Sequence, residues 1–183
     1  KVWIRNKEVN IQHPSDAVSQ GIAYVPEERK QLGLFLEMQV ADNIGCSSSK
    51  KNSSAWFNRN AVVETAKKYA ELLRITPRNV YQKAINLSGG NQQKVVLAKW
   101  LLTDPEILIV DEPTHGIDVG AKFEIYELLT SIAAQGKGVI MISSDMPELL
   151  GLCDRILILR QGELAGQLAA VEASEEKIMA LAT

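Results

Sequence analysis

Between positions 87 and 94 the sequence reads Leu87-Ser88-Gly89-Gly90-Asn91-Gln92-Gln93-Lys94, and a helix is predicted over residues 89–102. A helix start presents unpaired backbone N–H groups and the positive end of the helix dipole, which together suit a phosphate. Paired glycines let the backbone approach an anion closely, and Ser88 can cap the helix while donating to an oxygen. Taken alone, such a stretch is more often an ordinary helix cap, so its meaning depends on the rest of the chain.

A second stretch follows at positions 107–114, where the sequence reads Ile107-Leu108-Ile109-Val110-Asp111-Glu112-Pro113-Thr114. A buried strand that ends in two adjacent acids places charge at the carboxyl edge of a sheet, where open α/β folds bind ligands. Asp111 is predicted to hold Mg²⁺, directly or through water, and Glu112 to polarise an attacking water. A solvated strand end is the alternative, but it does not explain why both stretches occur at this spacing.

The rest of the chain alternates between apolar strands and helices. Nearly all-apolar strands separated by helices indicate a parallel sheet that is covered on both faces. The strands are predicted at residues 22–25, 107–110, 138–142 and 155–159, and the helices at 40–44, 61–73, 89–102, 121–134 and from Pro147.

Smaller features flank this alternation. Residues 2–5 and 8–11 read as strands around a turn at Asn6-Lys7, and a short helix is predicted between Pro14 and Gly21. Residues 45–59 read as a polar loop. Near the end, a hairpin with its turn at Gln161-Gly162-Glu163 precedes a helix capped by Ser174. No internal repeat or second domain is predicted, so the architecture is α/β with a small β and helical annex.

Composition excludes several classes of protein. A 46% hydrophobic and 23% charged chain of 183 residues is typical of one globular domain. A formal charge of -2 offers no basic surface for nucleic acid. Two cysteines do not make a disulfide framework and fit a reducing cytoplasm. No apolar run approaches the roughly 18 residues of a membrane span, so any work on a membrane goes through a partner. The chain has neither a signal peptide nor an initiator Met, so we expect it to be cut from a longer one.

A third stretch, Gly116-Ile117-Asp118-Val119-Gly120-Ala121-Lys122, completes a fixed order of motifs. The three together resemble an ATP-binding-cassette (ABC) ATPase, and more narrowly the second nucleotide-binding half of bacterial monosaccharide importers of the ribose, galactose and arabinose type. Residues 123–126 and 143–150 look most similar to the galactose/methyl-galactoside member, and the match runs from about Ile4 to the C-terminus.

The resemblance implies a fold and a domain organisation. The fold is a P-loop NTPase-type ABC ATPase core with a parallel sheet, a helical subdomain and a remnant of the antiparallel β-subdomain. Residues 1–183 then form a partial ATP-binding domain, whose helical subdomain carries the signature within about residues 40–102.

The resemblance also implies roles for single residues. Ser88, Gly89, Gly90 and Asn91 match the signature that closes over the γ-phosphate held by the opposite domain. Asp118 matches the loop acid that communicates between the two ATP sites. Asp111 matches the strand acid that holds the metal ion. Glu27 falls where the family places the Gln loop, which senses Mg²⁺ and water and touches the permease, and Ser144 stands at the position of the switch His.

The sequence departs from the family pattern at several points. No Gly-x-x-x-x-Gly-Lys-Ser/Thr phosphate loop occurs in the chain, and Gly136-Lys137-Gly138 reads as a turn. We therefore expect the phosphate loop upstream of Lys1, and expect this piece alone to bind ATP poorly. Ser144 cannot carry the positive charge of a His, and Glu27 puts an anion in place of an amide beside a polyphosphate. Asn91, in place of the commoner Gln, is a milder change.

Three functions remain open from these observations. The first is a transport ATPase that uses ATP and Mg²⁺ to drive monosaccharide import at the cytoplasmic side of the bacterial inner membrane. Its partners would be the first nucleotide-binding domain of the same polypeptide or a second copy, the membrane permease and, indirectly, a periplasmic sugar-binding protein. The second is a soluble cassette protein acting on nucleic acid or ribosomes, which the charge disfavours. The third is a regulatory half that hydrolyses weakly and completes the partner's ATP site. His13 and His115 are not expected to bind metal.

Overall fold

The computed structural model describes residues 1–47 and 58–183 of the chain. By its internal contacts the chain divides into two compact units, Lys1–Ile140 and Met141–Thr183. The boundary falls within strand β5 (Gly138–Ile142). Most of the polar loop predicted over residues 45–59 lies outside the described residues.

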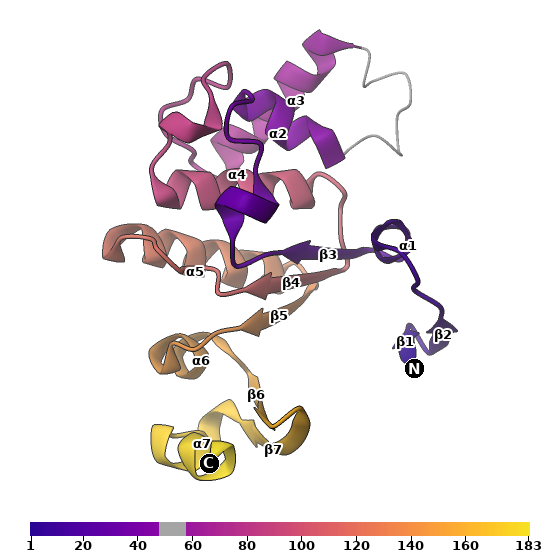
Figure 1. Cartoon of the computed structure of the whole chain (residues 1–183), viewed down its shortest axis with the longest axis vertical. Coiled ribbons are helices and arrows are strands. Elements are labelled where there is room, and N and C mark those ends of the chain that lie inside the picture. The colour runs from indigo at the N-terminus through magenta and orange to yellow at the C-terminus, as the bar shows by residue number, and fades with distance from the viewer. Residues whose placement is uncertain (48–57) are drawn as a thin grey trace. The chain divides into compact units, whose positions relative to one another are not determined.

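The first unit contains most of a three-stranded sheet (Figure 1). Its order is β3 (Ile22–Val25), β4 (Ile107–Asp111) and β5. β3 and β4 pair in parallel, with Ile22 opposite Ile107 and Val25 opposite Val110. This register confirms the predicted parallel pairing. The pairing has a physical reason, since short apolar runs rich in β-branched residues suit the interior of a sheet.

The two faces of this sheet differ in burial. Ala23, Val25, Leu108 and Val110 are buried, and helix α4 (Gly89–Leu101) packs against β3. Side chains on the other face of the sheet are more exposed to solvent. The exposed fraction is 44% for Tyr24 and 52% for Ile140. Within the described residues, the prediction of a sheet covered on both faces is therefore wrong. An apolar strand sequence indicates that both faces of the strand suit burial. It does not indicate which elements of this chain cover those faces.

Three helices pack together beside the sheet: α2 (Val40–Gly45), α3 (Arg59–Leu72) and α4. Ile44 and Leu97 are fully buried between them, and Gly45 permits a close approach because a Cβ there would lie 2.7 Å from Val62 Cγ1. Helix α5 (Val119–Ala134) packs against α4 and begins two residues earlier than the predicted Ala121, because Asp118 caps it. All four helices occur where the sequence predicts helices.

The amino-terminal hairpin is shorter than predicted. β1 (Val2–Ile4) pairs antiparallel with β2 (Lys7–Val9), and helix α1 (Pro14–Ser19) follows. The turn lies at Arg5 and Asn6, whose φ angles are 50° and 60°, one residue before the predicted Asn6-Lys7. A two-residue hairpin turn needs a positive φ at both of its central residues, because its twist then matches that of the two strands. With Arg5 and Asn6 in the turn, β1 ends at Ile4 and β2 begins at Lys7.

The second unit contains helix α6 (Met146–Leu152), the hairpin β6 (Arg155–Arg160) and β7 (Glu163–Ala169), and helix α7 (Glu175–Ala182). Ile156, Ile158 and Ile178 form its buried core. The predicted hairpin and the cap at Ser174, which accepts from the backbone N–H of Lys177, are both confirmed.

The structure also contains short helical turns that the sequence does not predict, at Arg29–Gly33, Ala84–Asn86 and Ala170–Glu172. Such pieces are too short to show an apolar period. In the part of the chain that the structure describes, no helix is both long and apolar enough to cross a membrane.

Candidate functional site

Ser88 caps helix α4, and its neighbours determine how its hydroxyl is oriented. Its Oγ accepts from the backbone N–H of Asn91 at 3.5 Å and from Asn91 Nδ2 at 2.9 Å. Asn91 is held in turn because its Oδ1 accepts from the backbone N–H of Thr76 at 2.7 Å. Since the serine oxygen accepts from the helix side, its own hydrogen can donate outward, and Ser88 is exposed. Asn91 thus orients the Ser88 hydroxyl, and the role of Ser88 towards a phosphate stays a prediction.

Gly89 and Gly90 lie in close contact with other segments of the first unit. A Cβ on Gly90 would lie 2.5 Å from Ala121 Cβ, at the start of α5. A Cβ on Gly89 would lie 2.9 Å from Arg29 Nη2 and 3.0 Å from the carbonyl oxygen of Gly116. The glycines are predicted to let the backbone approach an anion. In the structure, only a glycine at position 90 lets the starts of α4 and α5 meet.

Asp111 lies at the carboxyl end of β4 and receives a hydrogen bond from the neighbouring strand. Tyr24 Oη donates to Asp111 Oδ2 at 2.7 Å. This hydrogen bond, burial of the phenol and the nearby charges of Asp111 and Glu27 raise the pKa of Tyr24. Tyr24 is not among the predicted site residues, because a tyrosine in an apolar strand carries no signal of its hydrogen-bond partner.

Glu112 follows Asp111 in a left-handed backbone conformation, with φ of 42°. The backbone then turns, and the N–H of His115 donates to the carbonyl oxygen of Glu112 at 3.0 Å. A non-glycine residue in this region is strained, and such strain concentrates at functional sites.

The segment after β3 contacts the loop after β4. Glu27 Oε1 lies 3.5 Å from His115 Nδ1. The guanidinium of Arg29 donates to the carbonyl oxygens of His115 at 2.5 Å and Gly116 at 3.0 Å. Glu27, predicted at the Gln-loop position, therefore lies beside the loop that carries Glu112.

Asp118 caps α5, with its Oδ1 accepting from the backbone N–H of Ala121 at 3.0 Å. The residue is exposed, at the end of the loop that starts with Glu112. The two capped helix starts, Ser88 on α4 and Asp118 on α5, meet through Gly90 and Ala121. The first unit thus brings the predicted signature and loop acid onto adjoining helices.

Ser144 belongs to the second unit, between β5 and α6, and is exposed. The neighbouring Ser143 anchors this segment, because its Oγ donates to Glu148 Oε2 at 2.9 Å and accepts from the backbone N–H of Asp145 at 3.0 Å. Glu148 is buried. The catalytic role of Ser144 therefore stays a prediction.

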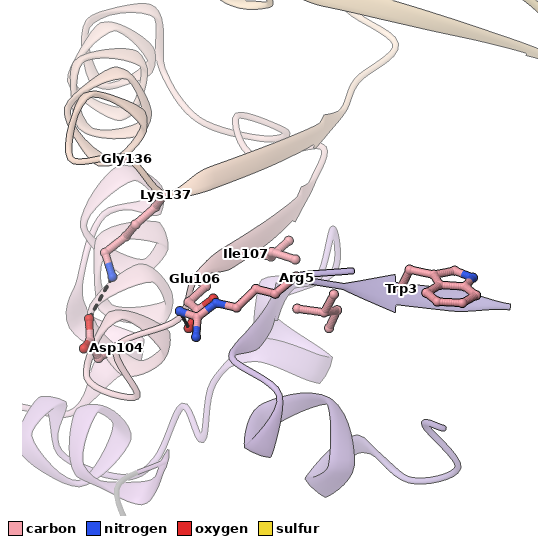
Figure 2. A pocket seen from close by; sticks show the side chains of 8 residues that line it. Trp3, Arg5, Asp104, Glu106, Ile107, Gly136 and Lys137 are labelled. Carbon is pink, nitrogen blue, oxygen red and sulfur yellow. Dashed lines mark hydrogen bonds and ion pairs between the residues drawn. The ribbon is translucent and has the colours of Figure 1, made fainter. Parts of the chain in front are cut away.

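A separate pocket of about 530 Å³ lies at the start of β4, at the other end of the strand from Asp111 (Figure 2). Figure 2 shows two ion pairs in its wall, Arg5 with Glu106 at 2.5 Å and Lys137 with Asp104 at 2.7 Å. Lys137 lies in the turn predicted at Gly136-Lys137-Gly138, and Gly136 has φ of 83°. None of the predicted site residues lines this pocket.

The acids at the end of β4 fit a metal that arrives with phosphates. Among the described residues, no group of three or more His, Cys, Asp and Glu side chains is placed to hold an ion. Mg²⁺ in nucleotide sites is commonly held by one or two carboxylates, phosphates and water. Asp111 and Glu112 can supply that carboxylate share, although not a cage of their own.

Comparison with known proteins identifies the family. The family model described as "ABC transporter" matches residues 1–115. The xylose import ATP-binding protein XylG of Moorella thermoacetica is 47% identical over 183 residues, which are 100% of this chain and 36% of the relative. The ribose import ATP-binding protein RbsA of Clostridium tetani is 49% identical over 180 residues, 97% of this chain and 36% of the relative. The chain thus spans 36% of the length of these relatives.

Solved structures show the same fold. The dimeric post-hydrolysis state of the ATP-binding cassette MJ0796, bound to ADP and Pi, gives a TM-score of 0.75 at 22% identity, over 92% of this chain and 72% of that one. A nucleotide-free ATP-binding cassette from an ABC transporter gives 0.76 at 23% identity, over 98% and 71%. With the motifs brought onto adjoining elements and the family model covering more than half of its length, the chain belongs to the ABC transporter family.

Proposed function

We propose that this chain is the second nucleotide-binding domain of an ATPase that couples ATP binding and hydrolysis to monosaccharide import. The observation that carries the proposal is the meeting of the capped start of α4 with the loop between Glu112 and Asp118. A helix start with an outward hydroxyl suits a phosphate, and the loop brings the acids of β4 to the same region. Relatives named for xylose, ribose and galactose import support the sugar class.

The residues take different roles in this proposal. Ser88, Gly89 and Gly90, with Asn91 orienting the serine, face the γ-phosphate of an ATP held by the opposite domain. Asp111 holds Mg²⁺ directly or through water, and Glu112 polarises the attacking water. Asp118 links the two sites.

The proposed partners follow from the relatives, which are import proteins nearly three times longer than this chain. Helices α2, α3 and α4 form the helical subdomain, over about residues 40–102. The domain pairs with a first nucleotide-binding domain or a second copy, and Glu27 lies near the contact with the permease. A periplasmic sugar-binding protein acts through that permease, which places the ATPase peripherally at the cytoplasmic face of the inner membrane. Nucleic acid is not among the proposed partners, since the formal charge is -2.

The two ATP sites are proposed to be unequal. Ser144 replaces a histidine, and Glu27 places an anion 3.5 Å from His115 where an amide is usual. Both changes weaken the site that this domain would build with its own acids, while the signature is intact. This domain then serves chiefly to complete the first domain's site, and the alternative is a regulatory half that hydrolyses weakly.

Replacing Ser88 and Glu112 separately in the full-length ATPase tests the proposal. Ser88→Ala should cost more ATP turnover than Glu112→Gln, because the serine serves the more active site. Ser131→Ala, on an exposed position of α5, is the matched control and should leave turnover unchanged. Equal losses from the two site variants would argue against unequal sites. Loss from Ser88→Ala with none from Glu112→Gln would favour the regulatory half.

A further inference from the structure

Arg29 is a buried arginine whose partners are backbone groups. Its exposed fraction is 8%, and its two hydrogen bonds go to carbonyl oxygens of His115 and Gly116, 86 and 87 residues along the chain. Its Nε finds no hydrogen-bond partner among the described residues. Burial lowers the pKa of Arg29 because it disfavours the charged form. The charge of Glu28 acts in the opposite direction but does not cancel the effect of burial. A buried cation whose hydrogen bonds go to neutral carbonyl groups is costly, so specific contacts must account for it.

The guanidinium lies where three segments of the first unit meet. Its own segment follows β3, the carbonyl groups belong to the loop after β4, and Gly89 starts the signature helix. A Cβ on Gly89 would lie 2.9 Å from Nη2, so the guanidinium occupies the space next to that glycine. Glu27 adds a second contact between the first two segments, 3.5 Å from His115 Nδ1.

The planar fork of arginine explains why this residue type stands here. Two carbonyl oxygens on consecutive residues can be bridged by Nη1 and Nη2 of one guanidinium, which a lysine ammonium cannot reproduce as a rigid pair. Both acceptors follow Glu112 closely and precede Asp118. Fixing them fixes the middle of the loop between the two acids.

We propose that Arg29 is a positioning residue that locks the loop from Glu112 to Asp118 onto the start of the signature helix. The signature serine and the loop acids then move as one body when the domain closes on nucleotide. The inference rests on the proposed function for its effect on turnover, whereas the lock itself concerns three segments of this chain.

Amide hydrogen exchange and steady-state kinetics on the full-length protein test the lock. The variants are Arg29→Met, which keeps an apolar stem, and Arg29→Lys, which keeps the charge without the fork. The control is Arg78→Met, at an exposed arginine whose partner Glu71 lies 3.7 Å away. Both Arg29 variants should speed exchange about tenfold or more at residues 113–118 and 88–91, and not at the buried centre of α4. They should lower kcat about tenfold while KM for ATP changes less than about twofold. Arg78→Met should change neither readout.

The outcomes separate this inference from the proposed function. Exchange that stays unchanged in Arg29→Lys, or that rises equally throughout the first unit, overturns the lock. A kcat that is unaffected while exchange rises locally also overturns it as a positioning role. If the unmodified full-length protein does not hydrolyse ATP, the proposed function fails, but the local exchange change in Arg29→Lys still decides the lock.

Discussion

At the scale of single residues, the candidate metal ligand depends on a neighbour from another strand. Tyr24 donates to Asp111 Oδ2 at 2.7 Å, and this bond fixes one oxygen of the carboxylate. A hydrogen bond from a phenol orients a carboxylate without adding a charge beside it, unlike one from a lysine or arginine. Tyr24 therefore orients the Asp111 carboxylate and leaves its charge unpaired by a cation in this contact.

The titration of Tyr24 checks this pairing. Its pKa is raised by the hydrogen bond to Asp111, so the bond's contribution to stability is fully present below about pH 10, the ordinary range of tyrosine. The contribution is lost as the pH rises through the raised pKa of the folded state. Asp111→Asn should lower the pKa of Tyr24 towards its ordinary value, measured by phenolate absorbance against a Tyr24→Phe reference. Glu64→Gln, on the exposed surface of α3, should leave it unchanged; an equal shift there would refute the pairing.

At the scale of elements, helices α4 and α5 are joined along their first turns. Gly90 meets Ala121, and further along Lys94 Nζ lies 2.6 Å from Glu124 Oε2 and donates to the carbonyl oxygen of Arg74 at 3.0 Å. The Lys94 side chain is buried, whereas Glu124 is half exposed. A steric contact at the helix starts and an ion pair one turn later fix the spacing of the two helices.

Gly90→Ala should disrupt that junction. The added Cβ would lie 2.5 Å from Ala121 Cβ, which cannot rotate away, so the helices must separate. We expect a loss of about 1–3 kcal/mol in the free energy of unfolding, measured by urea denaturation. Gly120→Ala is the matched control, because its Cβ meets only Asp118 Oδ1 at an ordinary 3.5 Å. That change should stay within about 1 kcal/mol of the parent. Equal stability of the two variants would contradict the close contact.

At the scale of the whole molecule, the chain carries some of the predicted ATP-site motifs without another. The signature motif and the acids of β4 are present, while the 183 residues contain no phosphate-loop motif. In P-loop enzymes that loop supplies the backbone N–H groups and the lysine that hold the β- and γ-phosphates.

We therefore predict that this chain on its own binds Mg-ATP weakly and does not hydrolyse it. Isothermal titration calorimetry should detect no binding at micromolar concentrations, and phosphate release should match the buffer blank. The full-length protein serves as the positive control in both measurements. Micromolar binding of Mg-ATP by the 183-residue chain would refute the prediction.

Much of the fold could be predicted because local pattern determines it. The bounds of β3 and β5 agree with the predicted residues, since short apolar runs between turn residues have little room to shift. Helix α5 extended further than predicted because its start depends on the Asp118 cap, a local side-chain bond that periodicity does not report. The hairpin turn moved for a similar reason, since it depends on the backbone of Arg5 and Asn6.

The order of the elements, and the motifs that begin or end them, follow from local sequence, because propensity, capping and apolar period act over a few neighbouring residues. Which of those residues meet depends on the packing of distant segments. The burial of Arg29 and its bonds to His115 and Gly116 join positions 86 and 87 residues apart, and the bond from Tyr24 to Asp111 also spans 87. Such contacts depend on how strands and helices pack in space. One buried guanidinium therefore lies between the start of the signature helix and the loop after β4, a contact that no local pattern predicts.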